Sequence, residues 1–421
     1  MELKPGYKQT EVGVIPEDWE VLNISEITKE ISMGPFGSDI KVSNFVKKGV
    51  PVLSGKNVAK EKLHDEFHNF VTAKKAKSLK KAIAKRGDIV VTHRGTIGQI
   101  AYIPKNSEYE TYVISQSQFR LRVDRRKSLP EWVVLYFHSD DGSRRLLEKK
   151  GHTGVPAISQ ATTTFRTLSL PLPTLAEQEA IAGALGDADA LIDSLEQLIA
   201  KKRLLKQGAM QDLLTGKKRL PGFEGEWEET TLGEIAMFLS GGTPARSNQE
   251  FWAGEIPWIS ATSLRCFEIW RSDKNVTKEA VTSGSKMAPV GASLLLVRGS
   301  ALHNEILCGL VTNPVCFNQD VKALVPHSRV VPIFLTILIR GRSDNLLNLV
   351  SSAGNTAGVL DTKLLKALEI RLPDPAEQTA IAAILSDMDL EIAALKANLS
   401  KARHVKQGMM QELLTGKTRL V

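Results

Sequence analysis

The stretch KQGAMQDLLTGKKRL, at residues 206–220, returns as KQGMMQELLTGKTRL at residues 406–420 of this 421-residue chain. Aligned at an offset of 200, Leu172–Leu220 and Leu372–Leu420 are identical at 27 of 49 positions, where unrelated segments would share only a few. A long internal repeat sets the architecture before any single motif does. The chain is therefore predicted to be a duplicated unit.

Each copy of the repeat carries the pattern of a long helix. Thr174 with Glu177 matches a capping box, and Asp374 and Pro375 are typical first residues of the second helix. The apolar stripe that follows recurs in steps of four and three, which is a heptad seam. The stripe consists of Ile181, Leu185, Ala188, Ile192, Leu195 and Ile199, and of Ile381, Leu385, Met388, Ile392, Leu395 and Leu399. One isolated stripe would be read as ordinary core, but two matching ones indicate a pair of helices that end near Gly216 and Gly416.

The blocks between the helices resemble each other more faintly. EDWEVLNISEI (17–27) matches GEWEETTLGEI (225–235), and THRGTIG (92–98) parallels LVRGSAL (296–302). Short β-branched runs punctuated by Gly and Pro indicate strands. Compact domains usually have their two ends close together, so the second helix should return antiparallel to the first. The predicted fold is two similar α+β domains, at 1–173 and 221–373, separated by two long antiparallel helices, at 174–220 and 374–421, that form a coiled coil with pseudo-two-fold symmetry.

Charge is distributed unevenly along the chain. The formal net charge is +8, and residues 1–173 hold 28 Lys and Arg against 19 Asp and Glu, while residues 221–373 hold 14 against 15. A basic excess favours a polyanionic partner. The N-terminal sequence has no apolar core of a signal peptide, and the longest apolar run, at 330–339, is about half a membrane span. Three cysteines without CxxC spacing are expected to be free, buried thiols in a reducing cytoplasm.

Several motifs together resemble the specificity subunit of type I restriction–modification systems. They are LPLPTLAEQEAI (170–181), IRLPDPAEQTAI (370–381), TEVGVIPEDWEV (10–21), GPFGSDIK (34–41), SGGTPARSNQEFW (240–252) and NQDVKAL (318–324). The resemblance implies two target-recognition domains, each reading one half of a split, asymmetric DNA site, with the paired helices as the ruler between them. It also implies that two methyltransferase subunits dock on the repeated helices and that two restriction/translocase subunits join them. The chain itself would hold no cofactor, and S-adenosylmethionine, ATP and Mg²⁺ would act on the partner subunits.

Candidate DNA contacts are polar residues on Gly-rich loops, because phosphates and base edges are bound by Lys, Arg, amide and hydroxyl groups. In the first block they are Ser38, Lys41, Arg94, Thr96, Gln116, Ser117 and Gln118. In the second block they are Thr243, Arg246, Ser247, Arg298, Asn318 and Gln319. A structural role is as open as DNA contact for each of them, and NQD (318–320) is also a turn pattern. Candidate partner-binding residues on the helices are Glu177, Gln178, Lys206, Gln207, Glu377, Gln378, Lys406 and Gln407.

Two other classes of protein are alternatives to a specificity subunit. A methyltransferase or nuclease would need a glycine-rich methyl-donor site, an NPPY-type pocket or a metal-ligand spacing, and the sequence shows none of these patterns. TGKT (415–418) lacks the first glycine of a P-loop, which would fall at Gln411. A coiled-coil scaffold that binds only protein stays open, and binding to duplex DNA would discriminate it.

Overall fold

The computed structural model describes residues 5–37, 39–148, 150–151, 157–352 and 357–420. Contacts divide the chain into two compact units, Met1–Glu196 with Ala397–Val421, and Gln197–Lys396. Each unit holds one globular part with mixed helices and strands and a segment of each long helix, which confirms the predicted fold class. The boundaries expected from the sequence keep each helix whole, and they stay a prediction.

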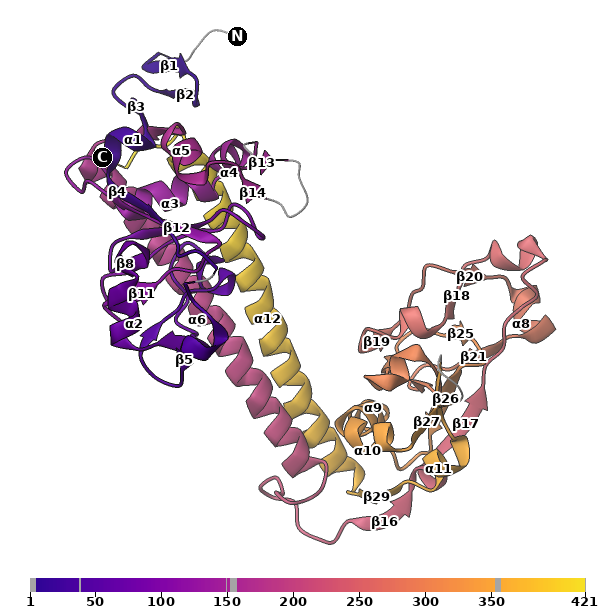
Figure 1. The fold of residues 1–421 in the computed structure, drawn as a ribbon. Helices are drawn as coiled ribbons and strands as arrows, with labels where there is room; N and C mark the ends of the chain where they lie inside the picture. Colours follow the sequence, from indigo (N-terminus) through magenta and orange to yellow (C-terminus); the bar gives the residue numbers. More distant parts are fainter. Residues whose placement is uncertain (1–4, 38, 149, 152–156, 353–356, 421) are drawn as a thin grey trace. The chain divides into compact units, whose positions relative to one another are not determined.

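A four-stranded antiparallel sheet, in the order β10-β9-β12-β4, is the main sheet of the first unit (Figure 1). Its strands are β4 (Thr28–Met33), β9 (Ile89–Thr92), β10 (Ile100–Tyr102) and β12 (Gln118–Val123). β9 is buried along its whole length, as an unbroken apolar run predicts for a strand covered on both faces. α3 (Pro130–His138) packs against β10 and buries seven of its nine residues.

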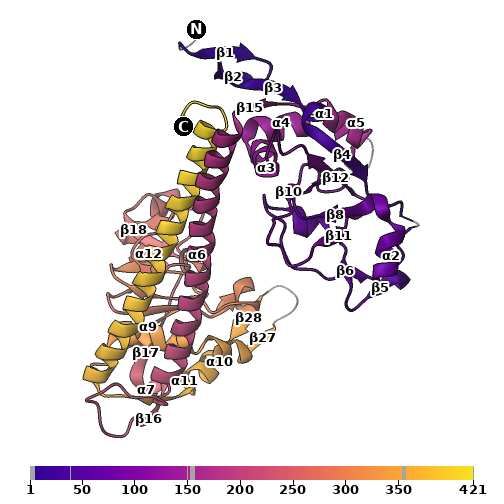
Figure 2. The same ribbon diagram turned by 90° about the vertical axis from the view of Figure 1, so that its left-hand side faces the viewer.

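The first unit contains further helices and strands outside this sheet. They are β1 (Tyr7–Thr10), β2 (Gly13–Pro16), β3 (Glu20–Asn23), α1 (Ile24–Ile27), β5 (Phe45–Val46), β6 (Val50–Pro51), β7 (Phe70–Val71), α2 (Ala73–Ser78), β8 (Ile83–Lys85), β11 (Thr111–Val113), α4 (Asp140–Leu147), β13 (Lys150–Gly151), β14 (Ala157–Ile158), α5 (Ala161–Arg166) and β15 (Ser169–Leu172). A separate apolar cluster lies between β7, β8 and β11, a region that Figure 2 shows from another side.

The second unit contains a five-stranded sheet in the order β17-β26-β22-β24-β19, antiparallel except between β24 and β19. Its strands are β17 (Ala236–Ser240), β19 (Glu268–Ile269), β22 (Ser293–Leu296), β24 (Cys308–Val311) and β26 (Val321–Pro326). The longest apolar run forms α9 (Pro332–Gly341), which packs against β22, β24 and β26. Within the described ranges, no helix combines the length and the apolar character that crossing a membrane requires.

The remaining elements of the second unit flank this sheet. They are β16 (Glu228–Thr231), α7 (Leu232–Ile235), β18 (Ile256–Ile259), β20 (Asn275–Val276), α8 (Lys278–Gly284), β21 (Lys286–Ala288), β23 (Arg298–Gly299), β25 (Val315–Phe317), α10 (Ser343–Asn348), β27 (Val350–Ser352), β28 (Gly358–Leu360), α11 (Thr362–Lys366) and β29 (Glu369–Leu372). Cys308 and Cys316 are buried free thiols as expected, but Cys266 is exposed, so the expectation for that cysteine was wrong.

The two long helices are α6 (Leu175–Leu213) and α12 (Pro375–Leu413). In both units a segment of one lies beside a segment of the other (Figures 1 and 2). The ion pairs between them are Lys406–Asp189 and Arg403–Glu196 in the first unit, and Lys206–Asp389 and Lys202–Glu391 in the second. Residue numbers rise along one helix as they fall along the other, so the segments are antiparallel, as predicted. The heptad seam is the side buried between them, with Ile181 and Ile381 at most 1% exposed.

A buried clamp that the sequence pattern did not reveal holds the start of α6. The Glu177 carboxylate accepts hydrogen bonds from Trp19 Nε1 (3.0 Å) and from the guanidinium of Arg419 (2.5 and 2.9 Å). Thr174 caps the helix by accepting from Glu177 N (3.3 Å), but the Glu177 side chain is committed to Trp19 and Arg419, so the capping box is only half formed. The residues after α12 therefore complete the first unit.

The second unit repeats this clamp with its own residues. Glu377 accepts from Trp227 Nε1 (3.0 Å) and from the guanidinium of Arg219 (2.7 and 2.7 Å). Gly216 and Gly416, the predicted helix ends, have φ angles of 70° and 69°, in the region that favours glycine. The chain thus turns sharply after each helix and delivers the Arg of GKKRL or GKTRL to the start of the other helix.

Candidate nucleic-acid interface

Three loops meet at one edge of the first unit's main sheet. β12 pairs with both β4 and β9 in a register that brings the end of β4, the end of β9 and the start of β12 to the same edge. Backbone bonds tie the loops together: Gly34 N donates to Gln118 O (2.8 Å), and His93 N donates to Ser117 O (2.9 Å). We call residues 34–37, 39–41, 93–99 and 115–118 the first polar edge.

The first polar edge contains Arg94, Thr96 and Gln116, all of them exposed. Arg94 makes no ion pair within the described ranges, so its guanidinium is available to a ligand. Thr96 Oγ1 donates to Gln99 Oε1 (2.9 Å), which fixes the loop while both side chains stay accessible. An exposed guanidinium beside hydroxyl and amide groups matches the donor and acceptor pattern of base edges in the major groove.

Ser117 and Lys41 also belong to this edge, but they differ in access. Ser117 is half-buried, and its hydroxyl is 3.0 Å from Ser115 Oγ. Lys41 is exposed, and its backbone N–H donates to Asn44 Oδ1 (3.0 Å) at the start of a short 3-10 turn. Ser38, predicted as a DNA contact, lies outside the described residues.

The prediction that Gln118 contacts DNA was wrong. Its side chain is 0% exposed, Oε1 accepts from Ser115 N (3.0 Å) and Nε2 donates to Ser54 O (3.1 Å). Both ends of the amide are used to hold loops of the polar edge. In the neighbouring loop, burial lowers the pKa of His93. A backbone hydrogen bond with Gln116 opposes this effect, and the charge of Arg94 adds to it, so the net pKa is lowered and Arg94 is the cation of this loop at pH 7.

Phe36 is the functional candidate that sequence reasoning missed. It is 83% exposed in a loop closed by Asp39, whose carboxylate accepts from Phe36 N (3.0 Å). A phenyl ring in water loses the hydrophobic stabilisation that burial gives. Beside a polar edge, such a ring can stack on a base or insert at a base step. The signal in the sequence was an aromatic residue between glycines, at Gly34 and Gly37.

The second unit has an equivalent edge, residues 241–247, 297–303 and 318–320, which we call the second polar edge. β26 pairs with β17 and β22 in a register like that of the first unit. Thr243 Oγ1 donates to Gln319 Oε1 (2.6 Å), and Arg298 N donates to Asp320 O (3.2 Å). Thus three predicted residues from three loops come together. Arg298 is exposed and, like Arg94, has no ion pair in the described part of the chain.

Asn318 is a turn residue, so its prediction as a DNA contact was wrong. It is 7% exposed, its Nδ2 donates to Asp320 Oδ2 (3.2 Å) and its backbone N–H donates to Ile259 O (3.0 Å). The turn reading of NQD is the correct one for this side chain. Arg246 and Ser247 are exposed in the first loop of the edge, and Arg246 lines a cavity of about 440 Å³ with Trp252.

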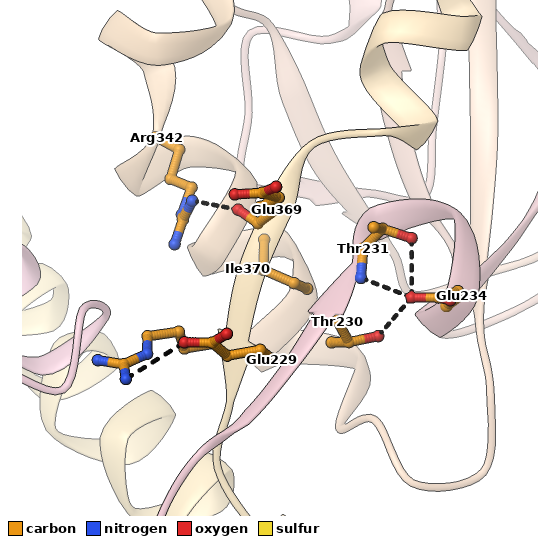
Figure 3. A pocket seen from close by; sticks show the side chains of 8 residues that line it. Glu229, Thr230, Thr231, Glu234, Arg342, Glu369 and Ile370 are labelled. Atoms are coloured by element: carbon orange, nitrogen blue, oxygen red, sulfur yellow. Dashed lines mark hydrogen bonds and ion pairs between the residues drawn. The ribbon is translucent and has the colours of Figure 1, made fainter.

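A cavity of about 460 Å³ in the second unit is lined by charged and hydroxyl side chains (Figure 3). The carboxylate of Glu234 accepts from Thr231 N (2.9 Å) and from two threonine hydroxyls, and these bonds, the backbone one first, lower its pKa. Arg342 donates to Glu369 O (2.7 Å). These groups are already paired as a helix cap and a strand contact. No group of three or more His, Cys, Asp or Glu that could hold a metal occurs among the described residues.

The partner-binding residues predicted on the helices fall into two sets. Glu177, Gln178, Glu377 and Gln378 are 0% exposed, so they cannot form a docking surface and this part of the prediction was wrong. The two glutamates form the clamps. The two glutamines bind backbone groups of their own unit: Gln178 Oε1 accepts from Leu129 N (2.9 Å), and Gln378 Oε1 accepts from Val331 N (2.8 Å).

The second set comes later on each helix. Lys206 and Lys406 lie on the seam and are paired with carboxylates of Asp389 and Asp189, at 2.5 and 2.7 Å. Gln207 and Gln407 are exposed. Of the eight predicted residues, only these two glutamines present a free polar group to the outside.

Comparisons with known proteins agree with the duplicated architecture. The family model described as type I restriction modification DNA specificity domain matches residues 16–202 and again residues 224–402. The chain is 32% identical over 186 residues to the EcoR124I/EcoR124II specificity subunit of Escherichia coli, covering 44% of this chain and 46% of that one. That match therefore spans less than half of the relative's length.

Two further likenesses extend over nearly the whole chain. A putative type I restriction enzyme specificity subunit, MjaX, of Methanocaldococcus jannaschii is 23% identical over 429 residues, covering 98% of this chain and 97% of that one. The crystal structure of a type I restriction–modification system S subunit from M. genitalium matches the fold with a TM-score of 0.56, 16% identity and 98% coverage of both chains. Since the family model covers most of the chain in two copies, the protein belongs to the family of type I restriction modification DNA specificity domains.

Proposed function

We propose that this chain is the DNA-recognition subunit of a type I restriction–modification complex, in which each globular domain reads one half of a bipartite, asymmetric site. One observation carries the proposal: the family model matches both repeats, and each repeat presents an exposed polar edge with an arginine, Arg94 or Arg298, that forms no ion pair among the described residues. The residues around the two arginines differ, as two different half-sites require.

The partners follow from the repeat. Two methyltransferase subunits bind the repeated helices, one to each copy, and two restriction/translocase subunits join the complex. S-adenosylmethionine, ATP and Mg²⁺ act on those subunits, so this chain is not an enzyme by itself, and the complex works on DNA in the cytoplasm. In the cavity of Figure 3, Glu234 is held as a helix cap and Arg342 is bonded to the backbone of Glu369, which supports a structural role for both groups.

The test is DNA binding and methylation by the chain together with its methyltransferase subunits. We expect duplex DNA containing one bipartite motif to bind tightly, and methylation mapping of a host genome to return that motif alone. A chain that binds its partner subunits but leaves DNA unbound and unmethylated would instead be a protein-only scaffold. Turnover of methyl donor by the chain alone would contradict the non-catalytic role.

A further inference from the structure

Residues 73–86 of the first unit form a strongly basic segment. They include seven Lys and Arg and no Asp or Glu, and they supply seven of the nine net positive charges of residues 1–173. In the structure they form α2, a short 3-10 turn at Lys80–Ala82, and β8. We call residues 73–86 the basic segment.

Four lysines of the basic segment are exposed and have no partner in the part of the chain that the structure describes. Lys74, Lys77, Lys80 and Lys81 form no ion pair and no side-chain hydrogen bond there. Lys74 and Lys77 are three residues apart on α2, so they are neighbours on the helix surface, and like charges in that position destabilise a helix. Folding therefore gains nothing from these charges.

The second unit has a counterpart of the basic segment with the same local structure. Thr72 and Thr277 each cap a short helix by accepting a hydrogen bond from the backbone N–H three residues further on (3.1 and 3.3 Å). The strand that follows ends in both units at a glycine with positive φ, Gly87 at 85° and Gly291 at 86°. The next strand, β9 or β22, is buried along its whole length.

The counterpart differs from the basic segment in charge. Residues 278–290 hold only two basic residues, Lys278 and Lys286, and one acidic residue, Glu279. The same cap, helix, strand and turn therefore form without a cluster of lysines. Because the fold does not require these charges, they are available for a function outside it.

The basic segment adjoins the first polar edge. Its strand β8 pairs with β11, and Figure 2 shows both strands in the first unit. Beyond this pairing, Ile114 N donates to Ala82 O (3.0 Å), and Ile114 is followed directly by Ser115, the first residue of one loop of the polar edge. Lys80 and Lys81 directly precede Ala82. A duplex bound at the first polar edge therefore passes close to these two lysines.

Exposed lysines beside a DNA-reading surface have the chemistry of a phosphate contact. A lysine ammonium is a compact point charge on a flexible stem, which binds phosphate oxygens without a fixed geometry and without reading the sequence. Duplex DNA carries one negative charge per about 1.7 Å of its axis, so several lysines along one segment can each bind a phosphate. Because the basic segment is continuous with the polar edge, the DNA backbone is favoured over an acidic protein surface.

We propose that the basic segment binds the sugar–phosphate backbone of the duplex at the first half-site, and that the second half-site has no equivalent contact. This deepens the proposed function and rests on it. The contact adds affinity without sequence preference, and salt weakens it because binding releases counterions from the phosphates. The complex therefore holds DNA that lacks the motif mainly through its first unit.

The test compares two double variants of the full chain, each in complex with the methyltransferase subunits of its own system. The test variant, Lys80→Gln with Lys81→Gln, removes two charges beside the polar edge. The control variant, Lys60→Gln with Lys105→Gln, removes two charges from exposed lysines of the same unit. These lysines lie near Tyr102, at the end of β9 opposite to the polar edge. All four side chains are exposed, so both variants should keep the thermal midpoint of the parent.

Binding is titrated at several salt concentrations on a duplex that carries the methylated motif and on a duplex that lacks it. Each phosphate contact contributes about 0.9 to the slope of log affinity against log salt, so the test variant should lose about one to two units of slope on both duplexes. At about 0.1 M salt its affinity should fall by about 10- to 100-fold, with the preference for the motif unchanged. Hydroxyl-radical footprinting should show backbone protection lost at one half-site only. The control variant should match the parent in all of these measurements.

Three results would overturn the proposal: a salt slope in the test variant equal to that of the parent, loss of backbone protection at both half-sites, or an equal loss of affinity in the control variant. Loss of methyltransferase subunits from the test variant with an unchanged salt slope would assign the basic segment to an acidic protein surface instead. If the parent complex binds neither duplex, the proposed function itself is wrong and the basic segment has no DNA to bind.

Discussion

The clamps are alike in the two units, whereas the polar edges of the two units differ. Trp19, Glu177 and Arg419 in one unit and their counterparts in the other make the same bonds at nearly the same distances. The polar edges keep the same three loops, but the first has one arginine, Arg94, and the second has two, Arg246 and Arg298. The bonds differ as well, because Gln118 is bonded to Ser54 in the first edge and Thr243 to Gln319 in the second. The residues of the clamps are therefore the same in both repeats, whereas the exposed residues of the polar edges differ.

This difference separates two kinds of constraint. A buried carboxylate tied to an indole and a guanidinium cannot change without leaving an unpaired group. An exposed amide at a loop tip changes at little cost to folding. Identical clamps with different polar edges are therefore the pattern expected of one scaffold that carries two different recognition surfaces.

Breaking the clamps should give the largest effect. Glu177→Ala or Glu377→Ala should destabilise the unit concerned by about 3 kcal/mol, the lower end for a broken buried ion pair because the arginines are partly exposed. Glu377→Ala should cost more, since Arg419 keeps a second carboxylate, Asp18 (2.8 Å), and Arg219 has none within the described residues. Hydrogen exchange resolved by peptide would locate the loss in one unit.

The matched control for this pair is Glu179→Ala. Glu179 is exposed on the same turn of α6, and its counterpart in the second repeat is Thr379. Its replacement should change stability by less than about 0.5 kcal/mol. Equal destabilisation by Glu179→Ala and Glu177→Ala would show that the clamps do not hold the units.

A half-buried triad of charged residues is a second point of comparison between the repeats, because among the described residues only the first repeat has it. Lys406 bonds Glu61 (2.6 Å) as well as Asp189, whereas Lys206 bonds Asp389 alone among the described residues. Glu61→Gln should cost about 1.5–3 kcal/mol at pH 7, the range for a hydrogen bond to a charged group. Urea unfolding of the first unit measures it.

The pH dependence of that cost has a definite sign. Burial is the largest single influence on the pKa of Glu61 and raises it. The hydrogen bond from Lys406, the charges of His138 and Lys406 and a backbone hydrogen bond together outweigh burial, so the pKa lies below its usual value. A carboxyl with a depressed folded pKa stabilises above its unfolded pKa, about 4.3, and loses that stabilisation as pH falls through the folded pKa. The difference in the free energy of unfolding between the parent and Glu61→Gln should therefore disappear below about pH 4. A gap that widens on acidification would contradict the ionised triad.

Replacing either of the two arginines should impair recognition of one half-site and leave the other half-site unaffected. Arg94→Ala or Arg298→Ala should weaken specific DNA binding by about 1–3 kcal/mol and relax the sequence preference in one half-site only. Binding titrations against duplexes altered in either half measure this. A loss that is equal on all sequences, with a shallower salt slope, would instead assign a phosphate contact.

Phe36 should give the smallest effect and is peculiar to the first polar edge. Phe36→Ala should weaken DNA binding by about 1 kcal/mol, the lower end for a stacked base. It should leave unfolding unchanged, because the ring is 83% exposed. Phe36→Trp should restore binding. Unchanged affinity in the Ala variant would show that the ring faces solvent in the complex too.

The sequence predicted the two long helices but not the clamps that hold their starts. The repeat and its heptad steps predicted two antiparallel helices of known ends, because helical periodicity is local and repeats itself. The clamp could not be predicted, because Trp19, Glu177 and Arg419 are far apart in the sequence and no local sequence pattern shows that they are in contact. The AEQ motif looked like a helix surface, but Glu177 and Gln178 are wholly buried.

The site was predictable by loop but not by side chain. The Gly-rich patterns identified the loops, and the strand register, which the sequence did not show, brings them to one edge in each unit. Whether an amide points outward depends on hydrogen bonds to distant backbone groups, such as the one from Gln118 to Ser54. Polar type alone therefore did not distinguish the exposed Gln116 and Gln319 from the buried Gln118 and Asn318.

The central claim, that each globular domain reads its own half-site on a common frame, is tested most directly by replacing one reader with the other. Residues 228–371 are exchanged for a copy of residues 20–171, between Trp227 and Leu372, whose counterparts Trp19 and Leu172 hold the same places in the first repeat. Genome-wide methylation is then mapped for the parent and the exchanged chain with the same partner subunits. In the exchanged chain, the second half-site should disappear, and both halves of the methylated site should carry the sequence of the first half-site. Persistence of the original second half-site in the exchanged chain would contradict it.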